Sequence, residues 1–137
     1  MEPEFEWDDD KAAENHSKHR VRFTAAKLVF DDPFAIERVF SVRASAGATR
    51  GRHAHRQCTQ FLTCASGAIE IMCDDGSDRA TYLLERPDRG LLVPKGIWAE
   101  QTYRTEGAVL LVLCDRAYDE ADYIRDYSEF LKFRTSA

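Results

Sequence analysis

The chain has 137 residues, 44% of them hydrophobic, which suits one domain with an ordinary core and excludes a disordered chain. Its 24 acidic residues outnumber its 19 basic ones, and the net charge of -5 argues against a general nucleic-acid-binding or membrane-binding surface. The four cysteines lack C-x-x-C spacing and are expected to be buried, reduced thiols. With no signal-peptide pattern and no apolar run near the roughly 20 residues of a membrane helix, we expect a soluble, cytoplasmic protein.

Residues 1–34 differ in character from the rest of the chain. Acidic residues just before Lys11 can cap a helix that runs to about His19, because they favour the positive end of the helix dipole. A second short helix is expected to start at Thr24. We predict that this region is a separate helical appendage and that residues 35–137 form the main domain.

The stretch from Phe5 to Pro33 resembles the opening of BrnT-type ribonuclease toxins. It fits their pattern F-x-W-D-x-x-K-x-x-x-N-x-x-K-H-x-V-x-F almost position by position. The resemblance ends near Glu37, and the basic catalytic residues of the toxin have no counterpart in this chain. We interpret the stretch as a helical segment that replaces or covers the start of the main domain, with a toxin–antitoxin component as the alternative.

From Ile36 onward the pattern is that of a β protein. Short apolar or alternating runs recur at close intervals and are separated by Gly, Pro and Asp turn signals. Strands are expected around residues 36–42, 61–64, 68–73, 80–84, 91–93, 98–103 and 108–113. Six to eight short strands of this kind indicate a sandwich or a barrel.

The segment from Asp119 to Lys132 is predicted to be helical. Its apolar side chains recur at helical spacing: Tyr123, Ile124, Tyr127, Phe130 and Leu131. Such an aromatic stripe is expected to serve packing. Open strand edges together with an apolar C-terminal helix predict a homodimer that buries both.

The most informative stretch runs from Gly47 to Gly67. A glycine is followed five residues later by His53-x-His55, after a gap of four by Gln60, and after a gap of six by a second glycine. Side chains two apart on a strand share a face, so both imidazoles can point into one barrel interior, with Gln60 facing them from the next strand. This spacing resembles the first motif of the cupin superfamily, G-x5-H-x-H-x4-E-x6-G.

The second cupin motif, G-x5-P-x-G-x2-H-x3-N, is matched in part from Gly90 onward. Pro94-x-Gly96 is intact, but Ala99 stands where the third histidine should be. A typical metal cupin binds through three His and one Glu, whereas this chain offers two His, an amide and an alanine, and the last two are poor ligands. We therefore expect no metal and no other cofactor. The resemblance predicts an all-β fold, a cupin jelly-roll barrel with a short N-terminal helical segment and a C-terminal helix.

Between Ile36 and Phe133 the chain closely resembles the WxcM-like cupins, the sugar 3,4-ketoisomerases. Separated blocks carry the resemblance, among them Arg38-Val39, Arg50-Gly51-x-His53-Ala54-His55, Trp98-x-Glu100, Gly107–Leu113 and Tyr118–Phe130. Members of that family move the carbonyl of a dTDP-4-keto-6-deoxyhexose from C4 to C3, need no metal and form homodimers. The resemblance implies a role in making a deoxyamino sugar for a polysaccharide or a glycosylated metabolite, with no nucleic-acid or membrane partner.

This chemistry makes sense of the two histidines. A ketone-shifting isomerase removes a proton from the carbon beside the carbonyl and returns a proton to the former carbonyl carbon, with an enediol between. Imidazole, with an ordinary pKa of about 6.5, can do both near neutral pH. We assign His53 and His55 as the acid/base pair and leave their individual roles open.

The resemblance also implies substrate-binding residues. Arg50 is the candidate for binding the diphosphate or steadying the enediolate oxygen. Gln60 would orient a histidine or the sugar, and Trp98 would stack on the thymine. Arg38 and Ser41 complete the expected site, although the family often has tyrosines directly after its Arg-Val pair and this chain has none there. A non-catalytic cupin that binds a sugar or small metabolite is the main alternative.

Overall fold

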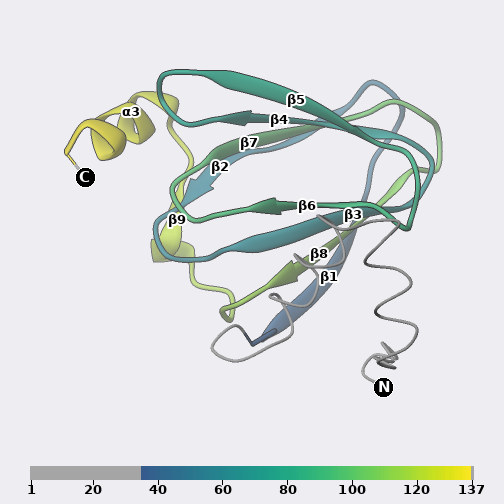
Figure 1. Cartoon of the computed structure of the whole chain (residues 1–137), viewed down its shortest axis with the longest axis horizontal. Coiled ribbons are helices and arrows are strands. Elements are labelled where there is room, and N and C mark those ends of the chain that lie inside the picture. Colours follow the sequence, from purple (N-terminus) through teal and green to yellow (C-terminus); the bar gives the residue numbers. More distant parts are fainter. Residues whose placement is uncertain (1–34, 137) are drawn as a thin grey trace, which may run out of the picture. The chain divides into compact units, whose positions relative to one another are not determined.

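The computed structural model of the chain describes residues 35–136, so the helices, the toxin-like stretch and the domain boundary predicted at the N-terminus lie outside the described residues. The described part forms two antiparallel sheets and one C-terminal α-helix (Figure 1). This arrangement confirms the predicted all-β fold. No helix within residues 35–136 is long and apolar enough to cross a membrane.

Four strands form the first sheet, in the order β1-β8-β3-β6. Their bounds are β1 (Arg38–Arg43), β3 (Gln60–Ser66), β6 (Gly90–Val93) and β8 (Val109–Cys114). The second sheet has the order β5-β4-β7-β2-β9. Its strands are β2 (Thr49–His55), β4 (Ile69–Asp74), β5 (Arg79–Leu84), β7 (Trp98–Tyr103) and β9 (Tyr123–Ile124).

The main core lies between the two sheets, which face each other in Figure 1. Alternate residues of each strand point inward, as the period of two requires. Leu62 and Cys64 of β3 and Leu110 of β8 meet Ile69 and Ile71 of β4 there, all at most 2% exposed. Within the described residues all four cysteines are free thiols, as predicted, and three of them are buried.

The C-terminal segment corrects the predicted helix from Asp119 to Lys132. A short 3-10 helix, η1 (Glu120–Asp122), leads directly into β9, and the α-helix α3 covers only Tyr127–Ser136. The helical spacing predicted the wrong structure for Tyr123 and Ile124, because these residues pair with His55 and Ala54 of β2 in a β-ladder. Pairing with a distant strand therefore outweighs the local pattern.

Helix α3 packs its apolar side against its own chain, and the predicted homodimer stays a prediction. Phe130 is fully buried, and its ring lies 5.6 Å from that of Trp98 on the face of the five-stranded sheet opposite the main core. The Tyr127 ring contacts Trp98 edge-on at 5.2 Å. The helix thus has a partner for its apolar side within the monomer.

A β-bulge in β2 decides which side chains face the core. Arg50 pairs with Gln101 and Gly51 with Glu100, but His53 pairs with Ala99, so Arg52 is an extra residue in the strand. Gly51 and Arg52 have φ of 87° and 55°, a conformation that glycine adopts easily and that bulges use. The extra residue brings Arg50 and His53, three apart, to the same inner face.

We predict that Gly51→Ala destabilises the protein more than Gly47→Ala. Both glycines have φ near +90°, where an added Cβ costs about 1–2 kcal/mol. At Gly47 the new Cβ meets nothing within 4 Å, whereas at Gly51 it would lie 2.6 Å from Oε1 of Gln101 and push that amide aside. Urea unfolding of both variants measures the difference. Equal losses would show that the bulge tolerates a side chain.

Candidate active site

A cavity of about 250 Å³ opens between the two sheets. Its polar lining comes from side chains of both sheets and of the segment after β9: Arg38, Arg50, His53, Gln60, Gln101, Tyr123 and Arg125. The apolar part of its wall belongs to inward-facing residues of β1, β3 and β8. Both sheets therefore contribute to a pocket that combines an apolar wall with convergent polar and cationic groups, as expected of a site for a polar, negatively charged small molecule.

The two histidines share the inner face of β2, as predicted. Their ring centroids lie 5.0 Å apart with the rings nearly perpendicular. Ala99 pairs directly with His53 across the ladder to β7. The structure therefore places an alanine next to the histidines where a metal cupin would carry its third imidazole.

Hydrogen bonding fixes the tautomer of His53. Its Nδ1 lies 3.0 Å from the carbonyl oxygen of Gly51, and because a carbonyl can only accept, Nδ1 carries the proton. Burial and the neighbouring His55 lower the pKa of His53 to about 4. At neutral pH the ring is thus uncharged, with a lone pair on Nε2 and one edge at the cavity.

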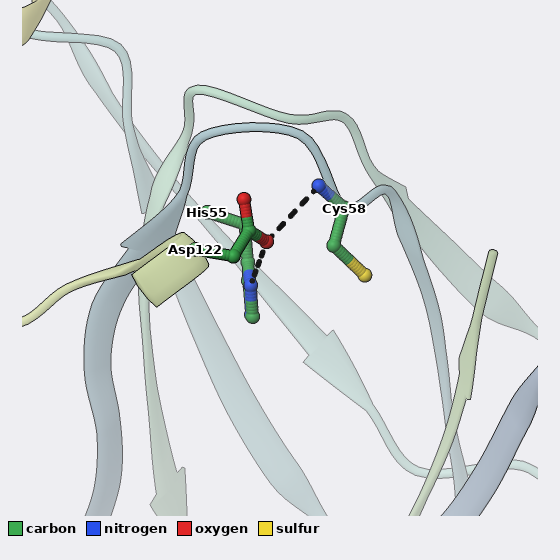
Figure 2. Close-up of side chains that lie close together, drawn as sticks. All are labelled: His55, Cys58 and Asp122. Carbon is green, nitrogen blue, oxygen red and sulfur yellow. Dashed lines mark hydrogen bonds and ion pairs between the residues drawn. The ribbon is translucent and has the colours of Figure 1, made fainter. Parts of the chain in front are cut away.

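Asp122 holds His55 in the same tautomer (Figure 2). Nδ1 of His55 donates to Oδ2 of Asp122 at 3.0 Å, and the same carboxylate accepts from the backbone N–H of Gln57 at 2.7 Å and of Cys58 at 3.2 Å. His55 is only 7% exposed, and burial lowers its pKa although Asp122 opposes that shift. Its Nε2 is the one buried side-chain nitrogen or oxygen in residues 35–136 without a hydrogen-bond partner.

Donor atoms of His55, Cys58 and Asp122 lie within 4.8 Å of one another and could be read as a metal site. The donors do not fit one. Nδ1 of His55 uses its proton to bind Asp122 and so offers no lone pair there. The neighbouring Cys114 thiol, together with burial, raises the pKa of the Cys58 thiol, which keeps it from becoming the thiolate that binds metals.

Tyr123 of β9 packs its ring against both histidines. Its ring centroid lies 4.9 Å from that of His53 and 4.4 Å from that of His55. Nη1 of Arg38 donates to its hydroxyl at 3.4 Å, and the guanidinium of Arg125 lies 4.2 Å from its ring centroid. Two bonds of 2.9 Å to Glu120 hold Arg125 in place.

The structure brings together most of the predicted site residues. Arg38, Arg50 and Gln60 line the cavity with His53. Trp98 does not line it: the side chain is 4% exposed and packs under α3 on the opposite face of β7. Ser41 lies on the exposed outer face of β1. The substrate-binding roles of Trp98 and Ser41 stay predictions, with no contact to this cavity in the described part of the chain.

Asp122, Tyr123 and Arg125 are the site residues that the sequence reasoning missed. All three belong to the segment that was predicted as a helix, and Asp122 lies 67 residues from His55. The signal that could have found them is their place in the block Tyr118–Phe130, which carries part of the resemblance to the WxcM-like cupins.

Comparison with known proteins points in one direction. Residues 12–135 match the family described as FdtA: WxcM-like, C-terminal. The chain is 37% identical over 102 residues to the TDP-4-oxo-6-deoxy-alpha-D-glucose-3,4-oxoisomerase of Aneurinibacillus thermoaerophilus, and the match covers 74% of this chain and 73% of the relative.

Solved structures give the same result. The sugar 3,4-ketoisomerase QdtA of Thermoanaerobacterium thermosaccharolyticum, in complex with TDP, has a TM-score of 0.74 and 35% identity, covering 79% of this chain and 80% of its own. The WlaRB TDP-quinovose 3,4-ketoisomerase of Campylobacter jejuni has a TM-score of 0.69 and 42% identity, covering 73% and 78%. A histidine-to-asparagine mutant of QdtA has been solved in complex with TDP-4-keto-6-deoxyglucose.

The lowered pKa of His53 predicts a pH dependence of folding. In the unfolded chain the imidazole titrates near 6.5, and in the folded chain near 4, so the unfolded chain binds the proton more readily between these values. The free energy of unfolding should therefore fall by up to about 3 kcal/mol as the pH drops from 6.5 to 4. Urea unfolding across this range should show a shallower fall for His53→Asn. Identical slopes would contradict the burial of an uncharged ring.

Proposed function

Because the chain belongs to the WxcM-like, C-terminal FdtA family, we propose that it is a metal-independent isomerase that moves the keto group of a dTDP-4-keto-6-deoxyhexose from C4 to C3. The observation that carries this proposal is the uncharged imidazole of His53, which is protonated on Nδ1 and lines the cavity, with His55 in the same tautomer packed against it. Relatives named as TDP-sugar 3,4-ketoisomerases support the substrate class and a place in deoxysugar biosynthesis.

His53 is positioned to move the proton between the two carbons. It lines the cavity, and its unprotonated Nε2 can accept the proton from C3, which the adjacent carbonyl makes acidic. The resulting enediol is protonated at C4 by the same imidazole. His55 is fixed by Asp122, and its ring packs against that of His53 and holds it in position.

Cationic and amide groups suit the rest of the substrate. Arg50 lines the cavity and can pair with the two phosphates, whereas Arg38 and Arg125 line it beside Tyr123. Within residues 35–136 the Gln60 side chain makes one weak hydrogen bond, to the Cys114 sulfur at 3.4 Å, so its carbonyl oxygen can accept from a sugar hydroxyl. The cavity of about 250 Å³ suits the sugar, with the nucleotide extending outward.

Proton NMR of dTDP-4-keto-6-deoxyglucose during incubation with the protein tests the function. We expect a 3-keto product, formed equally well with EDTA present because the site needs no metal. His53→Asn should reduce turnover by a factor of about 100 or more, the usual scale for losing an acid/base group. His55→Asn should also reduce turnover, because it removes the ring that holds His53 in position. The far-UV spectrum of each variant should match that of the native protein.

The outcomes separate the candidates. Tight binding of the ketosugar without any turnover would favour the non-catalytic cupin. Near-native turnover by both folded histidine variants would contradict the proposed site. Loss of turnover in EDTA, restored by a divalent ion, would contradict the metal-free mechanism.

We further propose a homodimer formed through the outer face of the four-stranded sheet. Four apolar residues stand in register across that face, one from each strand: Val39, Leu113, Phe61 and Leu92. Val39 and Leu92 stand at the two ends of this row and are 57% and 37% exposed. Within the described residues, the row therefore leaves apolar surface accessible at both ends. A second copy packed on this row would bury it by two-fold symmetry.

Light scattering at micromolar concentration should give a mass near twice the 15.7 kDa of one chain. Val39→Arg and Leu92→Arg should shift the protein towards the monomer, because each places a charge in the interface. Leu83→Arg is the matched control, since Leu83 is 50% exposed on the other sheet. A native protein that stays monomeric would rule out the dimer.

The free thiols favour a reducing compartment. Three of the four cysteines are buried and all are free. Reduced cysteines in a core without disulfide bonds are typical of cytoplasmic proteins. We therefore propose that the isomerase works in the cytoplasm.

A further inference from the structure

We propose that Tyr123 is a catalytic residue that exchanges a proton with the two oxygens of the enediol, a role that rests on the proposed isomerase function. The imidazole of His53 serves the carbon atoms in that reaction. A second group is needed for the oxygens, because the carbonyl oxygen at C4 becomes a hydroxyl while the hydroxyl at C3 becomes a carbonyl.

The backbone places Tyr123 beside the reacting groups. It pairs directly with His55 in the ladder between β9 and β2, so both side chains point to the same side of the sheet. Its ring packs against both imidazoles, and it lines the cavity with His53 and Gln60. When a carbon atom of the substrate lies against His53, the oxygen bonded to that carbon therefore lies near the hydroxyl of Tyr123.

The hydroxyl proton of Tyr123 is available. The Tyr123 oxygen accepts a hydrogen bond from Arg38, and the described residues provide no acceptor for its own proton. The other tyrosines with hydroxyl bonds donate theirs: Tyr103 to the carbonyl of Val42, Tyr118 to Glu120 and Tyr127 to Asp74. The fifth tyrosine, Tyr82, lies exposed on β5, in the edge position of its sheet.

Two cations support the transient phenolate. Nη1 of Arg38 is 3.4 Å from the hydroxyl, and the Arg125 guanidinium is 4.2 Å from the ring centroid. Positive charge at these positions stabilises the oxygen after its proton leaves, and it also steadies the oxyanion that forms on the sugar. The ion pair with Glu120 keeps Arg125 over the ring.

The proton and electron balance closes without an outside reagent. His53 takes the proton from C3, the C3–H electrons form the C3=C4 bond, and the carbonyl π electrons move to the C4 oxygen, which takes the proton of Tyr123. The phenolate then takes the proton from the C3 oxygen, and a C3=O bond forms. The C3=C4 electrons take the proton from His53 onto C4, and both residues return to their starting states.

Tyr123→Phe tests this role because it removes one oxygen and keeps the ring against the histidines. We expect kcat to fall by a factor of about 100 or more, the scale seen when one oxyanion donor is lost, with the Kd for the ketosugar changed by less than about threefold. Tyr118→Phe is the matched control: its ring lies 5.6 Å from that of Tyr123, and it should keep kcat within about twofold because its hydroxyl faces Glu120.

The results separate this role from simple packing. A Tyr123→Phe variant that keeps near-native kcat would overturn the proposal while leaving the isomerase function intact. Absence of turnover in the native protein would overturn both. If Tyr123→Phe melts at a much lower temperature, site-specific 3-fluorotyrosine replaces it. Its more acidic phenol should move the alkaline limb of the kcat–pH profile to lower pH, and an unmoved limb would refute the role.

Discussion

The carboxylate of Asp122 is the contact on which the site depends. It accepts hydrogen bonds from His55, Gln57 and Cys58, and so ties the chain just after β2 to the segment that leads into β9. Without an acceptor at Nδ1, the buried ring of His55 would lose its tautomer, and Nε2 would no longer carry the lone pair. The bond between Asp122 and His55 also places Tyr123 beside the histidines, because Tyr123 directly follows Asp122 in the chain.

The bulge in β2 complements this contact on the other side of the pair. A regular strand would place His53 and His55 inward but would turn Arg50 outward, since three residues change the face. The extra residue Arg52 restores Arg50 to the inner face, and the carbonyl of Gly51 in the same bulge fixes the His53 tautomer. One local irregularity therefore positions a cation and orients a base, which is a common use of bulges beside active sites.

The sequence predicted the parts of the site that depend on local spacing. His53 and His55 share a face because they are two apart, and Gln60 and Ala99 lie where the motif positions them. Trp98 lies on the opposite face because β7 alternates and Ala99 points inward, a result that the same period of two would have given. The sequence alone likewise shows that Ala99 stands at the position of the third histidine of the cupin motif.

What the sequence could not give depends on contacts between distant segments. Asp122, Tyr123 and Arg125 lie in a stretch whose apolar spacing suits a helix, and only its pairing with β2 makes it a strand. The face of Arg50 follows from the bulge, and two adjacent residues with positive φ leave no firm signature in a run of Arg and Gly.

Proton transfer by His53 requires defined tautomers of His53 and His55, and nitrogen-15 NMR of the imidazole side chains at pH 7 measures them. We expect both rings to be uncharged, with the proton on Nδ1 and none on Nε2. A ring protonated on Nε2, or a positively charged His53 at that pH, would contradict the assignment of His53 as the proton-transferring base and of His55 as the ring that positions it.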